Sequence, residues 1–485
     1  MAAWAAETVD GAMAECSNLG IPRVRADRPH TMAKARRRRK PSTLEKAALS
    51  RHCPGVMLMR NTEHHCDILV VGGGVAGLAA AVVMADLGFE VACVDAMPPE
   101  PTKAPALDGR TTALLQGAVR ALSACGVWAD CETESAPLNV MRIIDENGRR
   151  ANAPLTTVFD SADVGEGPFG FNVPNAVLRQ ALMRRLRELA NAHHIAPAKL
   201  SEIRYESTSV RATLEDGRVL TAALSIGADG KGSPCREAAG IRARRWTYGQ
   251  TAMAFSVAHT RPHGNTSTEF HRPNGPLVLV PLPGNRSSVV WVERERGAAA
   301  FMNLDEDAFL RALAARTRNV LGDLTKVGPR FSYPVGSLLA DRYAAHRLAL
   351  VGESAHALPP IGAQGLNLGI TDVTTLAEVL TDAWRQGCDI GAEEVLRSYE
   401  RRRRPDVVAR VIAVDALNRA VMTRFPPVQA ARHLGLSLLD RFTPLKTALM
   451  RQGMVPVGEM PKMMRGEAIR PVRRLAQPSG TTGIS

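Results

Sequence analysis

Three glycines at fixed spacing, followed by an acidic residue, are the residues of this chain best suited to hold a phosphate-bearing ligand. Gly72, Gly74 and Gly77 follow the apolar run Ile68–Val71, which predicts a buried parallel strand. Gly72 allows a tight turn, Gly74 lacks the Cβ that would keep a diphosphate away from the backbone, and Gly77 permits close packing of helix on strand. Asp95 lies 18 residues after Gly77, where its carboxylate could accept hydrogen bonds from a ribose. The spacing therefore predicts a dinucleotide-binding strand–helix–strand unit.

A membrane span is the alternative for this stretch, because Ile68 to Leu87 is about 20 mostly apolar residues long. Three adjacent glycines and the charged residues Asp67 and Asp86 argue against it. We therefore expect a helix over 75–87 and then a second strand that ends at Asp95.

A second group of polar residues follows another short apolar strand, residues 224–228. Asp229 and Gly230 come at its end, and Ser233 and Arg236 follow where the next helix begins. An acid and a glycine at a strand end recur where a parallel sheet approaches a bound dinucleotide, so this turn is a second candidate for contact with the ligand.

The third group begins after a strand predicted at 348–351. Gly352 and Glu353 come first, and Glu353 could hold the hydroxyl groups of a polyol. Pro360 lies in the loop that follows, and residues 365–367 (Gly, Leu, Asn) open a long helix. A helix N-terminus presents bare backbone amides to a ligand.

Three other residues or runs allow more than one reading. Arg110, which follows the second strand, is placed to meet cofactor phosphates or ribityl oxygens, or else lies at a solvated helix start. For His356 we expect a structural turn rather than a general base. The run Arg401–Arg404 is interpreted as the solvated face of a helix that continues to about Arg424.

The net charge of +13 would suit an anionic partner, but it is concentrated at the ends of the chain. Residues 1–66 carry twelve Lys or Arg against six Asp or Glu, and residues 456–485 carry five against two, which leaves +4 for residues 67–455. A nearly neutral body argues against nucleic-acid binding. The eight cysteines are scattered without a C-x-x-C pair or a Cys/His cluster, so neither a metal site nor a disulfide framework is indicated.

The expected fold is α/β, with a Rossmann-like dinucleotide domain interleaved with an antiparallel-sheet substrate domain and followed by a C-terminal helical region. Residues 1–60 are expected to be a disordered basic extension or sequence upstream of the true start, at Met57 or Met59. The other expected segments are the discontinuous dinucleotide domain at 64–175, 203–245 and 330–385, the substrate-binding sheet at 246–329, the helical region at 386–455 and a basic tail at 456–485.

The order of these three groups resembles that of the class A flavoprotein aromatic hydroxylases, which have a para-hydroxybenzoate-hydroxylase-like fold. The resemblance spans about 64–455. Finer motifs are similar to the ubiquinone-biosynthesis hydroxylase branch: Asp108-x-Arg110-x-x-Ala113-Leu114, Tyr248-x-Gln250, Gln364-Gly365-Leu366-Asn367-Leu368-Gly369, and Tyr399 with Arg403 and Asp406.

The resemblance implies a role for each candidate residue. Gly72, Gly74, Gly77 and Asp95 would hold the ADP half of FAD, and Arg110 would contact the cofactor. Asp229 would lie near FAD and the passing nicotinamide, and Gly352 would belong to the cofactor site. Glu353 would bind the ribityl chain, Pro360 would line the substrate side of the flavin, and the amides of Gly365, Leu366 and Asn367 would face the isoalloxazine ring. The family usually has Asp-Ala where this chain has Glu353-Ser354, so the carboxylate here is one methylene longer.

The resemblance also implies the chemistry. NAD(P)H would reduce FAD, O₂ would add to give a C4a-hydroperoxyflavin, and the ring of a prenylated phenol would be hydroxylated in ubiquinone biosynthesis. The protein would orient the ring and exclude water. No residue presents itself as the general base.

Two other functions are considered. A catabolic hydroxylase of a small soluble aromatic acid would need a cationic anchor between residues 247 and 295, for which Arg261 and Arg272 are candidates. A flavin-binding protein without hydroxylase activity would instead act through the basic N-terminal arm.

The chain lacks an apolar secretory signal, so we expect a cytoplasmic location. A hydrophobic substrate, an amphipathic C-terminal helix and a basic tail together predict peripheral contact with the inner membrane or delivery by a ubiquinone-biosynthesis complex. No nucleic-acid partner is expected.

Overall fold

The structure is a computed structural model that describes residues 63–98, 110–146, 155–165, 167–423, 425–454 and 459–472. The chain divides into two units, Met1–Met59 and Arg60–Ser485, and every described residue belongs to the second. The predicted extension at 1–60 therefore lies outside the described residues, as does Asp108.

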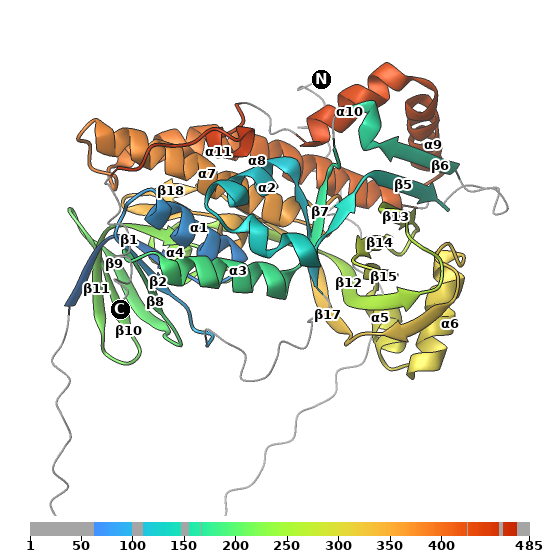
Figure 1. The fold of residues 1–485 in the computed structure, drawn as a ribbon, viewed down its shortest axis with the longest axis horizontal. Coiled ribbons are helices and arrows are strands. Elements are labelled where there is room, and N and C mark those ends of the chain that lie inside the picture. The colour runs from blue at the N-terminus through green and yellow to red at the C-terminus, as the bar shows by residue number, and fades with distance from the viewer. Residues whose placement is uncertain are drawn as a thin grey trace, which may run out of the picture. The chain divides into compact units, whose positions relative to one another are not determined.

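The glycine-rich turn follows the central strand of an eight-stranded sheet (Figure 1). Its central strand β1 (Glu63–Val71) pairs in parallel with β11 (Val219–Gly227) on one side and β2 (Val91–Val94) on the other, and β19 (Leu348–Leu350) pairs in parallel with β11. Four further strands complete the sheet: β8 (Ala192–Ile195), β9 (Leu200–Tyr205), β10 (Val210–Leu214) and β18 (Ala344–Ala345). Since parallel strands end at the same edge, all three candidate groups of residues begin at one edge of this sheet.

Helix α1 (Val75–Asp86) lies against this sheet and packs against α3 (Asn175–Glu188) and α7 (Gln364–Arg385). Most of its Ala, Val and Leu side chains are buried, which explains why its sequence is apolar on nearly every side. Helix α3 ends at Glu188, and Ala192 begins β8. The other helices of this half are α2 (Gln116–Ala124) and α4 (Pro234–Ala238).

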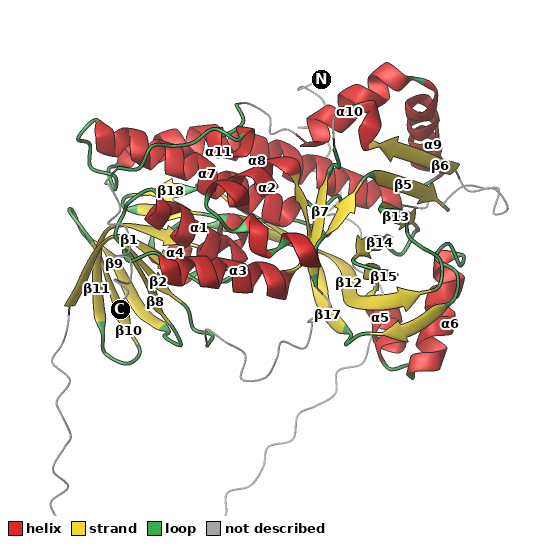
Figure 2. Cartoon of the chain, in the orientation of Figure 1, coloured by secondary structure: helices red, strands yellow, loops and turns green. Residues whose placement is uncertain are grey.

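A second, nine-stranded sheet is centred on β12 (Ala243–His259), the longest strand. Figure 2 shows helices α5 (Glu295–Met302) and α6 (Glu306–Thr317) beside it. The remaining strands are β5 (Val140–Asp145), β6 (Leu155–Asp160), β13 (Thr266–His271), β14 (Leu277–Leu282), β15 (Arg286–Arg294), β16 (Leu324–Val327), β17 (Phe331–Ala340) and β20 (His356–Ala357). This sheet extends beyond the range 246–329 predicted for it. It is also not purely antiparallel, because β13 pairs in parallel with β5.

The two faces of the second sheet differ. On one face Phe255, Phe309 and Trp291 pack together in an aromatic core beneath α5 and α6. On the other face lies a smaller apolar cluster built around Ala252, Val292 and Val335. The sequence alternation along β12 assigns its residues to these two faces in turn.

A small antiparallel sheet links the two large ones. It consists of β3 (Thr111–Leu115), β7 (Gly170–Pro174) and β4 (Ala136–Leu138). The Thr111 hydroxyl donates to Ser288 Oγ at 2.9 Å, and Asn172 Nδ2 donates to the Pro281 carbonyl at 2.8 Å, so this sheet is tied to β14 and β15. Single-turn helices lie around it, at η2 (Trp128–Asp130), η3 (Glu132–Glu134) and η4 (Ser161–Asp163).

The C-terminal region is helical: α8 (Glu393–Met422), α9 (Pro426–Arg441), α10 (Thr443–Met454) and α11 (Lys462–Arg465). Helices α7 and α8 lie side by side (Figure 1). Nowhere in the described ranges does a helix combine the length and the apolar character that crossing a membrane would require.

Two sequence predictions for this region are wrong. The Arg run is not a uniformly solvated face, because Arg403 is only 2% exposed, held by acids of α7 and α8. The segment predicted as a basic tail is ordered in its first part, since Met463 and Met464 are buried against the core and the Val472 amide donates to the Leu87 carbonyl at 2.7 Å. Residues 473–485 lie outside the described residues.

Candidate functional site

The turn between β1 and α1 leaves room for a ligand in front of Gly74. Gly72 has φ +107°, and a Cβ there would lie 2.4 Å from the Ala228 carbonyl oxygen. A Cβ on Gly77 would lie 1.8 Å from the Gly72 carbonyl oxygen, so helix and turn touch through backbone alone. A Cβ on Gly74 would meet no protein atom within 4 Å. Only the middle glycine therefore faces open space, as expected where a diphosphate approaches.

The N-terminus of α1 is electrostatically suited to an anion. Its N-cap is Gly74, which supplies no side-chain acceptor, and no acidic residue lies in the first turn. Its first backbone N–H groups thus keep their hydrogen-bonding capacity and the partial positive charge of the helix terminus.

Asp95 follows β2 and is largely buried beside this turn. Its Oδ2 accepts from Arg179 Nη2 of α3 at 3.1 Å and its Oδ1 from the Met97 amide at 3.1 Å. A Cβ on Gly73 would lie 2.1 Å from Asp95 Oδ2, so only glycine fits there. The carboxylate is held in one orientation at the strand end, where the sequence predicts a ribose contact.

The N-terminus of α7 is the second bare helix terminus. Its N-cap, Ala363, has φ +53° and makes no side-chain cap, and no acid lies in the first turn. Gly365 is exposed, and a Cβ there would meet nothing within 4 Å. Leu366 is half-buried, and Pro360 in the preceding loop is likewise partly covered.

Asn367 contributes its side chain to the protein rather than to the open space. Its Oδ1 accepts from the Leu115 amide at 2.9 Å, and its Nδ2 donates to the carbonyls of Ala113 and Ala363 at 2.8 and 2.7 Å. The amide thus pairs with β3 as a neighbouring strand would. Because Arg110 directly precedes β3, this pairing holds the exposed Arg110 segment against the start of α7.

Gly352 brings the two helix termini together. It has φ +60°, and a Cβ there would lie 3.2 Å from the Ala76 Cβ; a Cβ on Gly369 would lie 3.6 Å from the same atom and 3.4 Å from Gly352 Cα. Ala76 is the second residue of α1, and Gly369 lies about 6 Å along α7 from Gly365 at 1.5 Å per residue. Both bare termini are thus within reach of one extended dinucleotide.

Glu353 lies in the single-turn helix η5 (Gly352–Ser354) and is directed outward, with 62% of its side chain exposed. Its nearest cation is Lys231, with Nζ 3.4 Å from Oε1. Tyr333 lies near it: burial raises the pKa of Tyr333, the charge of Arg110 lowers it and that of Glu353 raises it. Glu353, Arg110 and Tyr333 therefore share one region, although they are far apart in sequence.

Asp229 follows β11 at the same sheet edge. Its Oδ2 accepts from the Cys235 amide at 2.9 Å, while its Oδ1 is buried without a hydrogen-bond partner among the described residues. An unsatisfied buried carboxylate oxygen is costly, so this atom is suited to accept from a ligand. Ser233 caps α4 by accepting from the Arg236 amide at 3.0 Å.

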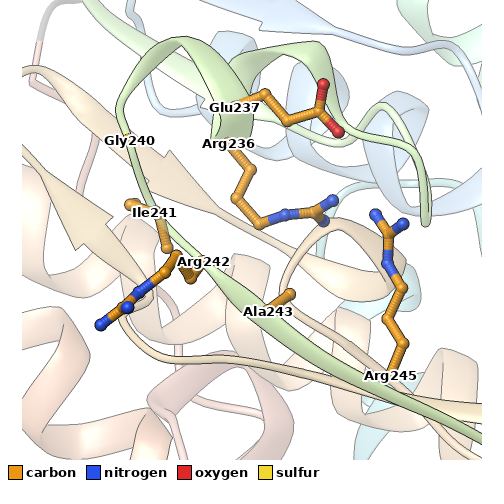
Figure 3. A pocket seen from close by; sticks show the side chains of 7 residues that line it. All are labelled: Arg236, Glu237, Gly240, Ile241, Arg242, Ala243 and Arg245. Atoms are coloured by element: carbon orange, nitrogen blue, oxygen red, sulfur yellow. The ribbon is translucent and has the colours of Figure 1, made fainter.

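A hollow of about 440 Å³ opens beside this turn, lined by α4 and the start of β12 (Figure 3). The Arg236 and Arg245 guanidinium groups face each other there, and both donate to the Lys231 carbonyl at 2.9 Å. Arg236 Nη1 also donates to the Ser354 carbonyl at 2.7 Å. Burial and the charge of Arg245 lower the pKa of Arg236. In the part of the chain that the structure describes, neither guanidinium has an ion pair with a carboxylate. The lining carries three arginines (Arg236, Arg242 and Arg245) against one carboxylate, Glu237, so the charge of the hollow favours an anion.

Neither arginine suggested as an anchor for a carboxylate lies in the apolar cluster of the second sheet. Arg261 is exposed and its Nη1 donates to the Val320 carbonyl. Arg272 pairs with Glu146 and lies over the ring of Phe270, which belongs to the core on the opposite face. The face that carries Ala252, Val292 and Val335 is instead flanked by Tyr248 and Tyr333.

His356 is a buried structural residue. Its Nε2 lies 2.6 Å from Asp372 Oδ2, and its ring stacks on Tyr343. Burial alone would raise the pKa of Asp372, but the charges of His356 and Arg403 outweigh burial and lower it. The expectation of a structural rather than a catalytic role is consistent with this geometry, although His356 begins β20 instead of lying in a turn. The partner Asp372 was missed. Its position eight residues into a helix that opens with Gln364 gave no indication of a partner on α8.

These residues fit FAD. Two bare helix N-termini can face its diphosphate and its ring, carboxylates lie where hydroxyl groups would bind, and glycines leave space at both termini. The crystal structure of p-nitrophenol 4-monooxygenase PnpA from Pseudomonas putida has the same fold, with a TM-score of 0.67 at 20% identity over 81% of this chain and 99% of that one. The architecture is that of the flavoprotein monooxygenases.

Sequence comparison gives the family. The model of the FAD binding domain family matches residues 65–414, and the chain belongs to this family. It is 40% identical to the ubiquinone hydroxylase UbiL of Rhodospirillum rubrum over 403 residues, which are 82% of this chain and 92% of the relative. It is 30% identical to the 3-demethoxyubiquinol 3-hydroxylase of Escherichia coli over 391 residues, 80% of this chain and 98% of the relative. The resemblance drawn from the motifs and the expected fold class are confirmed, and the chain is an FAD-dependent monooxygenase.

Proposed function

We propose that this monooxygenase hydroxylates the aromatic ring of a prenylated phenol in ubiquinone biosynthesis. The observation that carries the proposal is the 40% identity to a ubiquinone hydroxylase over nearly its whole length. The apolar face around Ala252, Val292 and Val335 supports it, because a prenylated ring needs apolar contacts rather than a carboxylate anchor.

Each predicted residue has a part in holding the cofactor. The turn formed by Gly72, Gly74 and Gly77, together with the bare N-terminus of α1, receives the diphosphate, and Asp95 receives the ribose. Arg110 would contact the cofactor, Glu353 would hold its ribityl chain, and the unsatisfied oxygen of Asp229 would accept a hydrogen bond from it. Bound FAD supplies the transfer of electrons from NAD(P)H and the activation of O₂.

The start of α7 and its preceding loop complete the site. Pro360 lines the substrate side of the ring system, and the amides of Gly365, Leu366 and Asn367 face it, with Gly352 at the junction of the two helix termini. The side chain of Asn367 keeps β3 closed against α7, so that segment contributes to excluding water from the reacting ring.

The hollow between Arg236 and Arg245 is proposed as the site for the phosphates of NAD(P)H. Two converging guanidinium groups form a strong phosphate site, and Lys231 connects this hollow to Glu353. The hydride donor would then be held from the Asp229 side of the cofactor.

Peripheral membrane contact, or contact with a lipid-handling complex, is proposed for the C-terminal helices. Ile412 of α8 and Leu434 of α9 are each 62% exposed, and α8 packs against α9 and α9 against α10. Further large apolar side chains are exposed in this region: Leu417, Phe425, Leu438, Phe442 and Leu445. Several exposed apolar side chains on adjoining helices are typical of an interaction surface.

Two experiments test the function. The purified protein is expected to carry FAD, and deletion of its gene is expected to leave a prenylated ubiquinone precursor that lacks one ring hydroxyl, identified by mass spectrometry. A deletion strain with an unchanged quinone profile, although the purified protein binds FAD, would refute the substrate assignment while leaving the cofactor assignment in place.

A further inference from the structure

A chain of charged groups, three of them fully buried and Arg410 partly buried, joins α7 to α8. Arg403 Nε donates to Asp372 Oδ1 and Arg403 Nη1 to Asp406 Oδ2, both at 2.8 Å. Arg410 Nε donates to Asp406 Oδ1 at 3.1 Å. Asp372, Arg403 and Asp406 are at most 2% exposed. Two carboxylates and two guanidinium groups balance in charge, so the set is neutral as a unit.

One end of this network holds the Gly352 turn. Asp372 Oδ2 accepts from the Gly352 amide at 3.1 Å and lies 2.6 Å from His356 Nε2. The same oxygen therefore fixes the residues before and after Glu353. Because Gly352 is in the left-handed region, its N–H points inward to Asp372 while the Glu353 side chain is directed outward.

The other end holds the start of α7. Arg410 Nη1 donates to Gln364 Oε1 at 2.9 Å, and Gln364 Nε2 donates to the Gly362 carbonyl at 3.1 Å. Gln364 is the first residue of α7 and directly precedes Gly365. The network therefore ends on the two backbone segments assigned to the ribityl chain and the ring system.

A network of this kind does more than stabilise the helix pair. Replacing buried ion pairs by apolar residues of similar volume is often neutral or stabilising, so burial of these charges is not needed to pack α7 on α8. What fixed hydrogen bonds add is a defined distance between groups.

We propose that the Asp372–Arg403–Asp406–Arg410–Gln364 network is a positioning device, which sets the Gly352 turn and the first turn of α7 at the separation that FAD requires. These are positioning residues, since they act on the cofactor through backbone they hold. The proposal rests on the assignment of FAD to the two helix termini.

The test is a double-mutant cycle on the contact at the α7 end. Arg410→Met removes the donor and Gln364→Leu the acceptor, and the apoprotein of each variant is titrated with FAD while flavin fluorescence is followed. Arg410→Met is expected to raise the Kd for FAD about 5- to 10-fold, the equivalent of one hydrogen bond. The double variant should bind FAD no more weakly than the single variant with the higher Kd, because both changes break the same hydrogen bond.

Matched variants separate positioning from folding. Arg401→Met, an exposed arginine of the same helix, should leave the Kd unchanged, and Arg410→Lys should recover part of the affinity because it keeps the charge at Asp406. The midpoint of unfolding of each apoprotein is measured without FAD.

The outcomes are distinct. If Arg410→Met and Gln364→Leu lower the apoprotein midpoint but leave the Kd for FAD unchanged, the network only supports the fold and the inference is overturned. Additive effects of the two changes would overturn it too. If the unaltered protein takes up no FAD, the cofactor assignment itself fails, which is a separate result.

Discussion

A comparison of Gly74→Ala with Gly77→Ala tests whether the open space at the start of α1 receives the diphosphate. The two positions are three residues apart and undergo the same chemical change. Gly74 has φ −68° and a Cβ there meets nothing within 4 Å, whereas a Cβ on Gly77 would lie 1.8 Å from the Gly72 carbonyl oxygen. Gly74→Ala should therefore affect only the binding of the ligand, whereas Gly77→Ala should lower the stability of the fold.

The expected magnitudes follow from these distances. In the apoprotein, Gly74→Ala should change the free energy of unfolding by no more than about 1 kcal/mol, with a gain expected because the unfolded chain loses freedom. Gly77→Ala forces backbone apart and should cost at least about 1–3 kcal/mol. The added methyl group of Gly74→Ala should weaken amide-to-phosphate hydrogen bonds worth about 1.5–3 kcal/mol, which raises the Kd for FAD about 10- to 100-fold.

Two measurements on each variant give these quantities. Urea unfolding of the flavin-free protein reports the free energy of unfolding. Titration with FAD, followed by flavin fluorescence, reports the Kd. At a fixed excess of FAD, a tenfold weaker Kd also removes about 1.4 kcal/mol of the stabilisation that the ligand provides, which is an independent check.

The reasoning is refuted if Gly74→Ala binds FAD as tightly as the unaltered protein, because the space in front of Gly74 would then hold no part of the cofactor. It is also refuted if the flavin-free Gly74→Ala protein is destabilised as strongly as Gly77→Ala.

Three further predictions concern other parts of the molecule. Arg245→Gln should raise the Kd for NAD(P)H about tenfold in stopped-flow flavin reduction. Arg244→Gln, an exposed neighbour on β12 that is not among the residues lining the hollow, should leave this Kd unchanged, and equal effects would exclude the hollow. Burial and the hydrogen bond to Asp415 raise the pKa of Tyr248 to about 12. The stability that Tyr248 contributes is therefore complete below its ordinary pKa of about 10 and is lost as the pH rises from about 10 to about 12. Tyr248→Phe should reduce this loss of stability in urea midpoints measured from about pH 9 to 12, and an unchanged dependence on pH would contradict the prediction. Ile412→Ser with Leu434→Ser should reduce flotation with anionic vesicles and leave FAD content unchanged; undiminished flotation would exclude this surface.

The parts of the fold that were predicted from sequence depend on local patterns. The β1–α1–β2 unit follows from an apolar run, three glycines and a helix-length stretch of Ala and Val, all within 30 residues. Its limits differ from the prediction by one residue, since α1 ends at Asp86 rather than Leu87 and β2 ends at Val94 rather than Asp95. The start of α7 was likewise visible as a glycine-rich loop that leads into a helix.

The parts that were missed depend on partners far apart in sequence. Strand β5 was expected beside the dinucleotide fold but pairs with β13, more than 120 residues later. The burial of Arg403 requires Asp372 on another helix, so the arginine run alone looked solvated. Met463 and Met464 are two apolar residues in a basic segment, too short a pattern to predict that they pack against α2.

The order of strands in the eight-stranded sheet has a consequence for how the protein is made. Strand β1 leaves the ribosome early, but its neighbour β11 follows about 150 residues later, and β19 only beyond residue 347. The Leu350 carbonyl accepts from the Tyr399 hydroxyl at 2.7 Å, so the end of β19 gains this partner only once the beginning of α8 has been synthesised. A nascent chain shorter than about 365 residues contains the start of α1 but lacks the start of α7, the second helix terminus assigned to the flavin. Premature termination therefore yields fragments with an open sheet edge and no cofactor, which are substrates for proteolysis rather than partial enzymes.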